Sequence, residues 1–143
     1  MEEKFFYCNS CGNLAIMAIA SGVTPECCGE PMEKLHASHE EEGKEKHIPV
    51  VQHINDHKLK VCISVHPHPM TDDHCIKFIC LETSEGGIIH YLKPGDTPEA
   101  CFRYVGKPKA VYAYCNVHGL WRCEVKPYCG YEPKNQDNVG CRL

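Results

Sequence analysis

Alternating apolar and polar positions dominate the second part of the chain and predict short β-strands. Residues 58–65 (KLKVCISV) and 74–83 (HCIKFICLET) alternate with a period of two, as strands with one buried face do. Shorter apolar runs at 88–94, 101–105 and 109–115 are each bounded by Pro, Gly or Asp. Because no stretch keeps a long period of 3.6 residues, we expect little helix. Short strands separated by turn signals are typical of a β-sandwich or a small barrel.

The first 36 residues carry a different pattern, in which two close cysteine pairs flank one short apolar run. So short a segment buries too little surface to fold without a metal, a disulfide or a partner. We therefore predict an all-β protein in four parts. These are a small metal-knuckle domain, a linker or active-site loop, a β-sandwich domain and a weakly structured tail, at residues 1–36, 37–46, 47–126 and 127–143.

Composition favours metal binding over disulfides. The 143 residues include 12 cysteines and 10 histidines, and disulfides have no use for histidine. The N-terminus shows no secretory signal, and the apolar run at 14–20 is too short to cross a membrane. We expect a cytoplasmic protein with reduced thiols and no membrane partner. The net charge of −4 does not favour nucleic acid as a partner.

A tetrahedral thiolate site is predicted near the N-terminus from Cys8, Cys11, Cys27 and Cys28. The C-x-x-C turn of Cys8 and Cys11, followed by Gly12, lets backbone amides point at the sulfurs. The neighbouring residues Cys27 and Cys28 reach one ion only with a strained local backbone. Iron and zinc both accept four thiolates, and a disulfide pair is the alternative.

A second set of ligands lies at predicted strand ends. Cys115 and His118 are three residues apart around a turn, which suits either a metal or a reactive cysteine with a nearby base. A single histidine is more often solvated than a ligand. Taken together, four imidazoles and one thiolate exceed what structural zinc needs and suit five-coordinate iron. The set is His47, His68, His74, Cys115 and His118.

Six motifs, in one order along the chain, give the sequence a specific family resemblance. The first consists of the two N-terminal cysteine pairs, and the other five are EKHIP, PHPM, DHCI, LKPGDTPEACF and CNVHGLW. Over roughly residues 5 to 125 the chain resembles desulfoferrodoxin, the two-iron class of superoxide reductase. The tail with Cys129 and Cys141 lies beyond this resemblance, and these two cysteines could pair or bind metal.

The resemblance implies a fold, an activity and roles for particular residues. The fold would be a desulforedoxin-like domain followed by an immunoglobulin-like β-sandwich, usually as a homodimer. Superoxide would be reduced to hydrogen peroxide, with electrons from a small donor protein such as rubredoxin. Two irons would be bound, one by the four N-terminal cysteines and one by four equatorial imidazoles and the axial thiolate of Cys115. Glu45 would be the sixth ligand of the oxidised state, and Lys46 the cation beside the open position.

Three other functions remain to be separated by experiment. They are a non-catalytic iron electron-transfer protein, a zinc-binding interaction module and a superoxide dismutase. Trp121 is expected to pack in the core rather than to carry electrons. The remaining cysteines of strand-like runs are expected to behave as small apolar residues: Cys62, Cys75, Cys80, Cys101 and Cys123.

Overall fold

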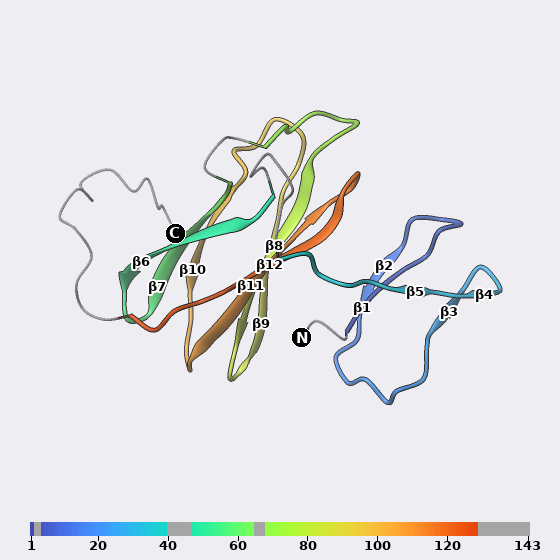
Figure 1. Cartoon of the computed structure of the whole chain (residues 1–143), viewed down its shortest axis with the longest axis horizontal. Coiled ribbons are helices and arrows are strands. Elements are labelled where there is room, and N and C mark those ends of the chain that lie inside the picture. Colours follow the sequence, from blue (N-terminus) through green and yellow to red (C-terminus); the bar gives the residue numbers. More distant parts are fainter. Residues whose placement is uncertain (2–3, 40–46, 65–67, 129–143) are drawn as a thin grey trace. The chain divides into compact units, whose positions relative to one another are not determined.

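A computed structural model describes Met1 and residues 4–39, 47–64 and 68–128 (Figure 1). The chain divides into two compact units, Met1–Ala37 and Ser38–Leu143. Within these described ranges all twelve elements are strands, which confirms the expected all-β class. Among the described residues, no helix has the length and apolar character needed to span a membrane.

The first unit is built from very short strands around a small core. Its three-stranded sheet has the order β2-β1-β5, and a separate hairpin joins β3 to β4. Its apolar cluster consists of Phe6, Cys8 and Met32, with Ala15, Met17 and Cys27 packed against it. Two cysteines are thus part of the little core that this unit has. The strands are β1 (Phe5–Tyr7), β2 (Leu14–Ile16), β3 (Glu26–Cys27), β4 (Glu30–Pro31) and β5 (Glu33–Lys34).

The second unit is a sandwich of two antiparallel sheets, as the alternating runs predict (Figure 1). One sheet has the order β10-β7-β6 and the other the order β12-β11-β8-β9. The strands are β6 (Pro49–Asn55), β7 (Lys58–Ile63), β8 (Ile76–Thr83), β9 (Gly86–Tyr91), β10 (Glu99–Arg103), β11 (Pro108–Cys115) and β12 (Gly119–Glu124).

The core of the sandwich lies between the facing sheets and follows from the period of two. In β7, Leu59, Val61 and Ile63 are buried, whereas the residues between them face outward. Ile79 of β8 and Ala113 of β11, which are paired across the opposite sheet, join the same cluster. Each of the buried Leu, Val and Ile side chains contributes about 1.5–3 kcal/mol through its burial. This packing gives the strand ends a rigid base.

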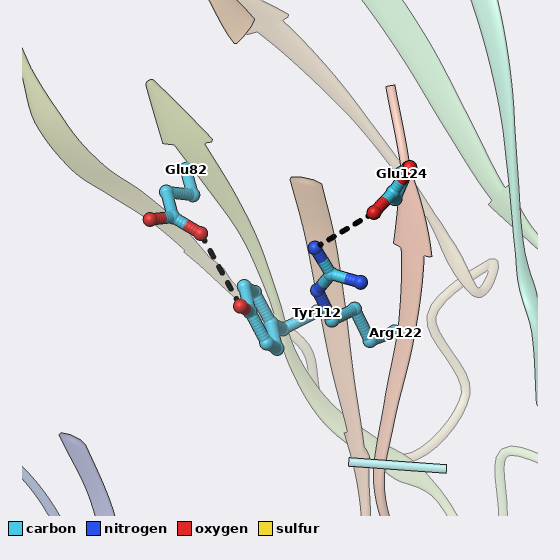
Figure 2. A network of polar contacts seen from close by, with 4 residues as sticks. All are labelled: Glu82, Tyr112, Arg122 and Glu124. Carbon is cyan, nitrogen blue, oxygen red and sulfur yellow. Dashed lines mark hydrogen bonds and ion pairs between the residues drawn. The ribbon is translucent and has the colours of Figure 1, made fainter. Parts of the chain in front are cut away.

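The outer face of the four-stranded sheet holds a polar network around Tyr112 (Figure 2). The hydroxyl of Tyr112 donates a hydrogen bond to Glu82 at 3.2 Å, and the Arg122 guanidinium lies 5.9 Å from its ring centroid. Arg122 in turn pairs with Glu124 at 3.5 Å. Burial raises the pKa of Tyr112 to about 12, so the phenol remains a donor near neutral pH.

The cysteines of the strands follow the expectation with one exception. Cys75 and Cys80 are fully buried thiols, and Cys62 and Cys123 are half-buried thiols. Cys101 forms a disulfide bond, so its predicted role as a small apolar thiol is wrong. Its side chain lies on the outer face of β10, where the alternation that identifies a strand places it away from the core.

Candidate metal centres

The five histidine and cysteine ligands predicted after residue 46 lie at one end of the sandwich. His47 precedes β6, whose first residue Pro49 pairs with Ile63 at the end of β7. Cys115 ends β11 and pairs with Ile76 at the start of β8, two residues after His74. His68 lies in the β7–β8 connection and His118 in the β11–β12 turn. Antiparallel order therefore brings five distant sequence positions to one edge.

The four imidazoles form a closed ring. Neighbouring rings have centroids 4.6–4.9 Å apart and planes at 68–82°, in the order His47, His68, His74, His118. His47 and His74 face each other across the ring at 6.4 Å. One ligand atom from each histidine and the sulfur of Cys115 lie within 4.8 Å of one another. Four nitrogens around a centre with one sulfur are ligands that iron accepts, as do other transition metals.

The hydrogen bonds identify donor atoms for a metal. Nδ1 of His68 donates to the carbonyl of Pro69 at 2.6 Å, which leaves the lone pair on Nε2. Nε2 of His68 is buried and has no hydrogen-bond partner. Nε2 of His47 lies 3.0 Å from Nδ1 of His118, so both nitrogens face the same point. Burial lowers the pKa of His68 to about 4, so this imidazole is neutral and available near neutral pH.

Cys115 is suited to bind a metal rather than to act as a free nucleophile. Its side chain is fully buried, and burial raises the pKa of its thiol. Nδ1 of His118 lies 3.8 Å from the sulfur, too far for a strong hydrogen bond. The backbone N–H of His118 donates to the sulfur at 3.4 Å and would stabilise a thiolate. A reactive cysteine needs a lowered pKa and access, so the metal interpretation is favoured over the nucleophile.

Asn116 is a positioning residue that the sequence analysis missed. Its Nδ2 donates to the carbonyl of Asp73 at 2.9 Å, and its Oδ1 accepts from the backbone N–H of Cys75 at 2.8 Å. The side chain thus joins the turn after Cys115 to both neighbours of His74. The position of this Asn directly after a ligand cysteine was the only hint of its role in the sequence. Its hydrogen-bond partners are 41 and 43 residues away, so the sequence does not reveal them.

Replacing Asn116 by Ala is expected to weaken iron binding at this site by roughly 10–100-fold. The backbone around His74 then loses two hydrogen bonds, while all five ligands remain. Competition with a chelator, followed by absorbance of the iron-loaded protein, measures the change. Asn9→Ala, at an exposed residue of the first unit, is the control. Equal chelator resistance in both variants would show that Asn116 does not position His74.

Trp121 contacts the site directly. Its indole stacks on the His47 imidazole with centroids 4.6 Å apart and planes at 15°. Trp121 also forms an isolated β-bridge with Ser38. The N–H of Ser38 donates to the carbonyl of Leu120, and the N–H of Arg122 donates to the carbonyl of Ser38. Trp121 therefore has the packing role that was expected, but it packs against His47, which is a proposed metal ligand.

The four N-terminal cysteines also come together. One sulfur from each of Cys8, Cys11, Cys27 and Cys28 lies within 4.8 Å of the others, and the sulfurs of Cys11 and Cys27 are 3.6 Å apart. Cys28 has a φ of 56°, which confirms the strained backbone expected of adjacent ligands. Cys8 is buried, whereas Cys11 and Cys28 are exposed, so the site is open to solvent on one side.

The four cysteines at this site do not ionise independently, because each thiolate makes it harder to ionise its neighbours. The backbone N–H of Cys11 lowers the pKa of Cys8 to about 7. Interaction with Cys11, and then with Cys27 and Cys8, raises the pKa of Cys28 to about 12. Four thiolates therefore cannot coexist near neutral pH without a cation. A bound metal removes this conflict, since it favours the deprotonated form of every ligand.

Four residues with a possible role in the sequence analysis lie outside the described residues. They are Glu45 and Lys46 in the segment before His47, and Cys129 and Cys141 in the C-terminal tail. Their roles stay predictions.

Known proteins resemble this chain over most of its length. The desulfoferrodoxin family profile matches residues 39–124. A desulfoferrodoxin of Syntrophotalea carbinolica is 39% identical over 126 residues, covering 87% of this chain and 99% of that protein. A desulfoferrodoxin homolog of Archaeoglobus fulgidus is 38% identical over 121 residues, covering 83% and 94%.

A solved structure extends the likeness to the fold. The superoxide reductase from Treponema pallidum matches with a TM-score of 0.71 and 29% identity, over 83% of this chain and 95% of that one. The family carries two iron centres, and the described residues offer two fitting ligand sets. The chain therefore belongs to the desulfoferrodoxin family.

Proposed function

We propose that this protein is a superoxide reductase, which converts superoxide to hydrogen peroxide with one electron and two protons and releases no oxygen. The observation that carries the proposal is the closed ring of four imidazoles with the buried sulfur of Cys115 beside it. The family membership and the Treponema pallidum superoxide reductase support it. When bound, ferrous iron supplies the electron.

The ligand residues prepare the site for an anion. His47, His68, His74 and His118 are proposed to hold the iron as neutral imidazoles, with Cys115 as the one anionic ligand. Neutral ligands leave the metal's positive charge largely intact, and one thiolate offsets only part of it. The fixed tautomer of His68 and the N–H donor to Cys115 hold these groups in their binding forms.

The first centre is proposed to be a rubredoxin-like iron held by Cys8, Cys11, Cys27 and Cys28. A small electron-donor protein such as rubredoxin would reduce the protein, which would act as a cytoplasmic homodimer. The donor protein, the homodimer and the cytoplasmic location follow from the family resemblance. Experiments on them are separate from the test of superoxide reduction.

Lys46 is proposed to attract superoxide, and Glu45 would be a further carboxylate ligand of a bound, oxidised iron. The net charge of −4 repels an anion, so a local cation must overcome it. At physiological salt only charges within about 8 Å act strongly, and Lys46 is adjacent to the ligand His47.

Replacing Lys46 by Ala is therefore expected to slow the second-order reaction with superoxide by roughly tenfold in low salt and to flatten its salt dependence. Pulse radiolysis at several ionic strengths measures both. Lys44→Ala is the matched control, since it removes the same charge from the same run. Equal second-order rates with superoxide for the two variants would show that Lys46 does not attract the substrate.

Rapid mixing of the reduced, iron-loaded protein with superoxide tests the function. We expect one peroxide per superoxide consumed, no oxygen, and about two irons per chain. Oxygen in the ratio of one per two superoxide would show a dismutase instead. Iron oxidation no faster than that of free rubredoxin would favour the non-catalytic electron carrier, and zinc in place of iron would favour the interaction module.

A further inference from the structure

We propose that the orientation of the ligand His47 depends on two residues that bind no metal. Ser38 holds the edge strand β12 through its backbone, β12 positions Trp121, and the indole of Trp121 fixes the ring plane of His47. Ser38 lies just before residue 39, where the match to the family profile begins. The proposal rests on the proposed function only in that iron is bound at His47, and it does not need the reaction with superoxide.

The first observation is the packing around the His47 ring. The Trp121 indole lies nearly parallel to this ring at 15°, whereas the rings of His68 and His118 approach it at 69° and 73°. The last torsion of a histidine side chain has only a weak intrinsic preference, so contacts decide its ring plane. A flat partner against one face excludes most rotations. Trp121 therefore keeps Nε2 of His47 facing Nδ1 of His118, at 3.0 Å.

The second observation is that the indole has no hydrogen bond of its own. Its Nε1 is buried and has no hydrogen-bond partner in the part of the chain that the structure describes. A buried tryptophan usually finds a partner for its N–H, and such a bond would help to fix the ring. Without it, the position of the indole depends on packing and on the position of the Trp121 backbone.

The third observation is that the backbone around Trp121 is held from both sides. On one side β12 pairs with β11, and Trp121 lies opposite Ala113. On the other side β12 is the edge of its sheet, where a strand lacks a neighbour for half of its backbone groups. Ser38 takes this place, because its N–H donates to the carbonyl of Leu120 and its carbonyl accepts from the N–H of Arg122, both at 2.9 Å. These two bonds flank Trp121 and fix the backbone that carries the indole.

The bonds of Ser38 involve its backbone, whereas its side chain is exposed. Ser38 is the first residue of the second unit, so the bridge lies within that unit. Ser38→Ala therefore keeps both bonds. Proline has no N–H, so Ser38→Pro loses the bond to Leu120. The two substitutions separate the role of the backbone from that of the side chain.

A ring that is held in place before the metal arrives binds it more tightly. Less side-chain freedom is lost on binding when a ligand is already oriented. Groups that orient a ligand histidine also tune the metal, including its reduction potential. Loss of the Trp121 face should therefore change both the iron affinity and the reduction potential of this site, even though all five ligands remain.

Chelator competition with the full-length, iron-loaded protein tests the proposal. It is followed at the absorbance that is lost in Cys115→Ser, which belongs to this site. We expect Trp121→Leu and Ser38→Pro each to lower the iron affinity by roughly tenfold and to shift the reduction potential. Trp121→Phe keeps a flat ring and should recover most of the affinity, and Ser38→Ala should match the wild type. Phe102→Leu is the control for lost core packing, because Phe102 pairs with Leu59 near the start of β7, away from the ligands.

The double variant Ser38→Pro with Trp121→Leu shows whether the two residues act through one path. If Ser38 acts through Trp121, the double variant binds iron no more weakly than Trp121→Leu alone, since effects of coupled residues do not add. Losses of affinity that add would overturn the proposal. Equal affinities of Trp121→Leu and Trp121→Phe would do the same, because the flat face would then not matter. This last comparison holds even where Ser38→Pro fails to fold.

Fluorescence gives a second measurement that needs neither iron nor superoxide. Trp121 is the one tryptophan of the chain, so the emission reports on its own mobility and surroundings. In the iron-free protein, Ser38→Pro should lower the anisotropy and shift the emission to longer wavelength, and Ser38→Ala should do neither. Unchanged emission of a folded Ser38→Pro protein would overturn the link from Ser38 to Trp121 and would leave superoxide reduction untouched. Failure to reduce superoxide likewise leaves the affinities and the emission as tests of this proposal.

Discussion

Replacing Cys115 by Ser is expected to abolish most superoxide reduction while the β-sandwich stays folded. Serine has nearly the same shape, and its oxygen can accept the backbone N–H of His118 that now approaches the sulfur at 3.4 Å. Burying the hydroxyl costs about 1–3 kcal/mol, which an ordered sandwich tolerates. The metal, however, loses its one soft anionic ligand, and an alcohol does not ionise in a fully buried position.

Absorption spectroscopy of the iron-loaded variant separates this effect from a loss of folding. The thiolate-to-iron charge-transfer band should disappear, and the rate with superoxide should fall by roughly 100-fold or more, since removing a direct ligand should cost at least as much as removing a group that orients one. Circular dichroism should still show the sheet. Cys75→Ser is the matched control, because Cys75 is also a fully buried thiol near this end of the sandwich. A Cys115→Ser protein with the wild-type band would mean that another cysteine binds the iron.

The ligands could be predicted from sequence because their chemistry is local. Within a few residues the sequence shows a thiol and an imidazole around one turn, and it shows the N-terminal cysteines in close pairs. Strand alternation then indicates a scaffold that can bring distant ends together. It does not give the order of strands within a sheet, so the ring order His47, His68, His74, His118 required the fold.

The groups that support the ligands could not be predicted, because their partners are set by topology. Asn116 acts on residues more than forty positions away, and Trp121 stacks on His47 across the sandwich end.

Removing the metal from the four-cysteine site is expected to unfold the first unit and to leave the second folded. Two of the six residues in the small apolar cluster, Cys8 and Cys27, are also proposed ligands. A unit of Met1–Ala37 with strands of two or three residues has little other stabilisation. Metal binding to comparable cysteine sites supplies about 10–16 kcal/mol of folding free energy, far more than this core can replace.

Cys11→Ser isolates the contribution of the metal. Cys11 is exposed and lies outside the apolar cluster, so its replacement removes a ligand without removing a packing group. Hydrogen–deuterium exchange should show rapid exchange of the amides of Phe5–Tyr7, while those of β8 and β11 stay protected. Asn9→Ala, also exposed and close to the site, should keep the wild-type pattern, because the one side-chain hydrogen bond of Asn9 within the described residues goes to Glu33 and is exposed. If Phe5–Tyr7 remained protected in metal-free Cys11→Ser, the apolar cluster alone would be enough to fold this unit, and the metal would be there for electron transfer rather than for stability.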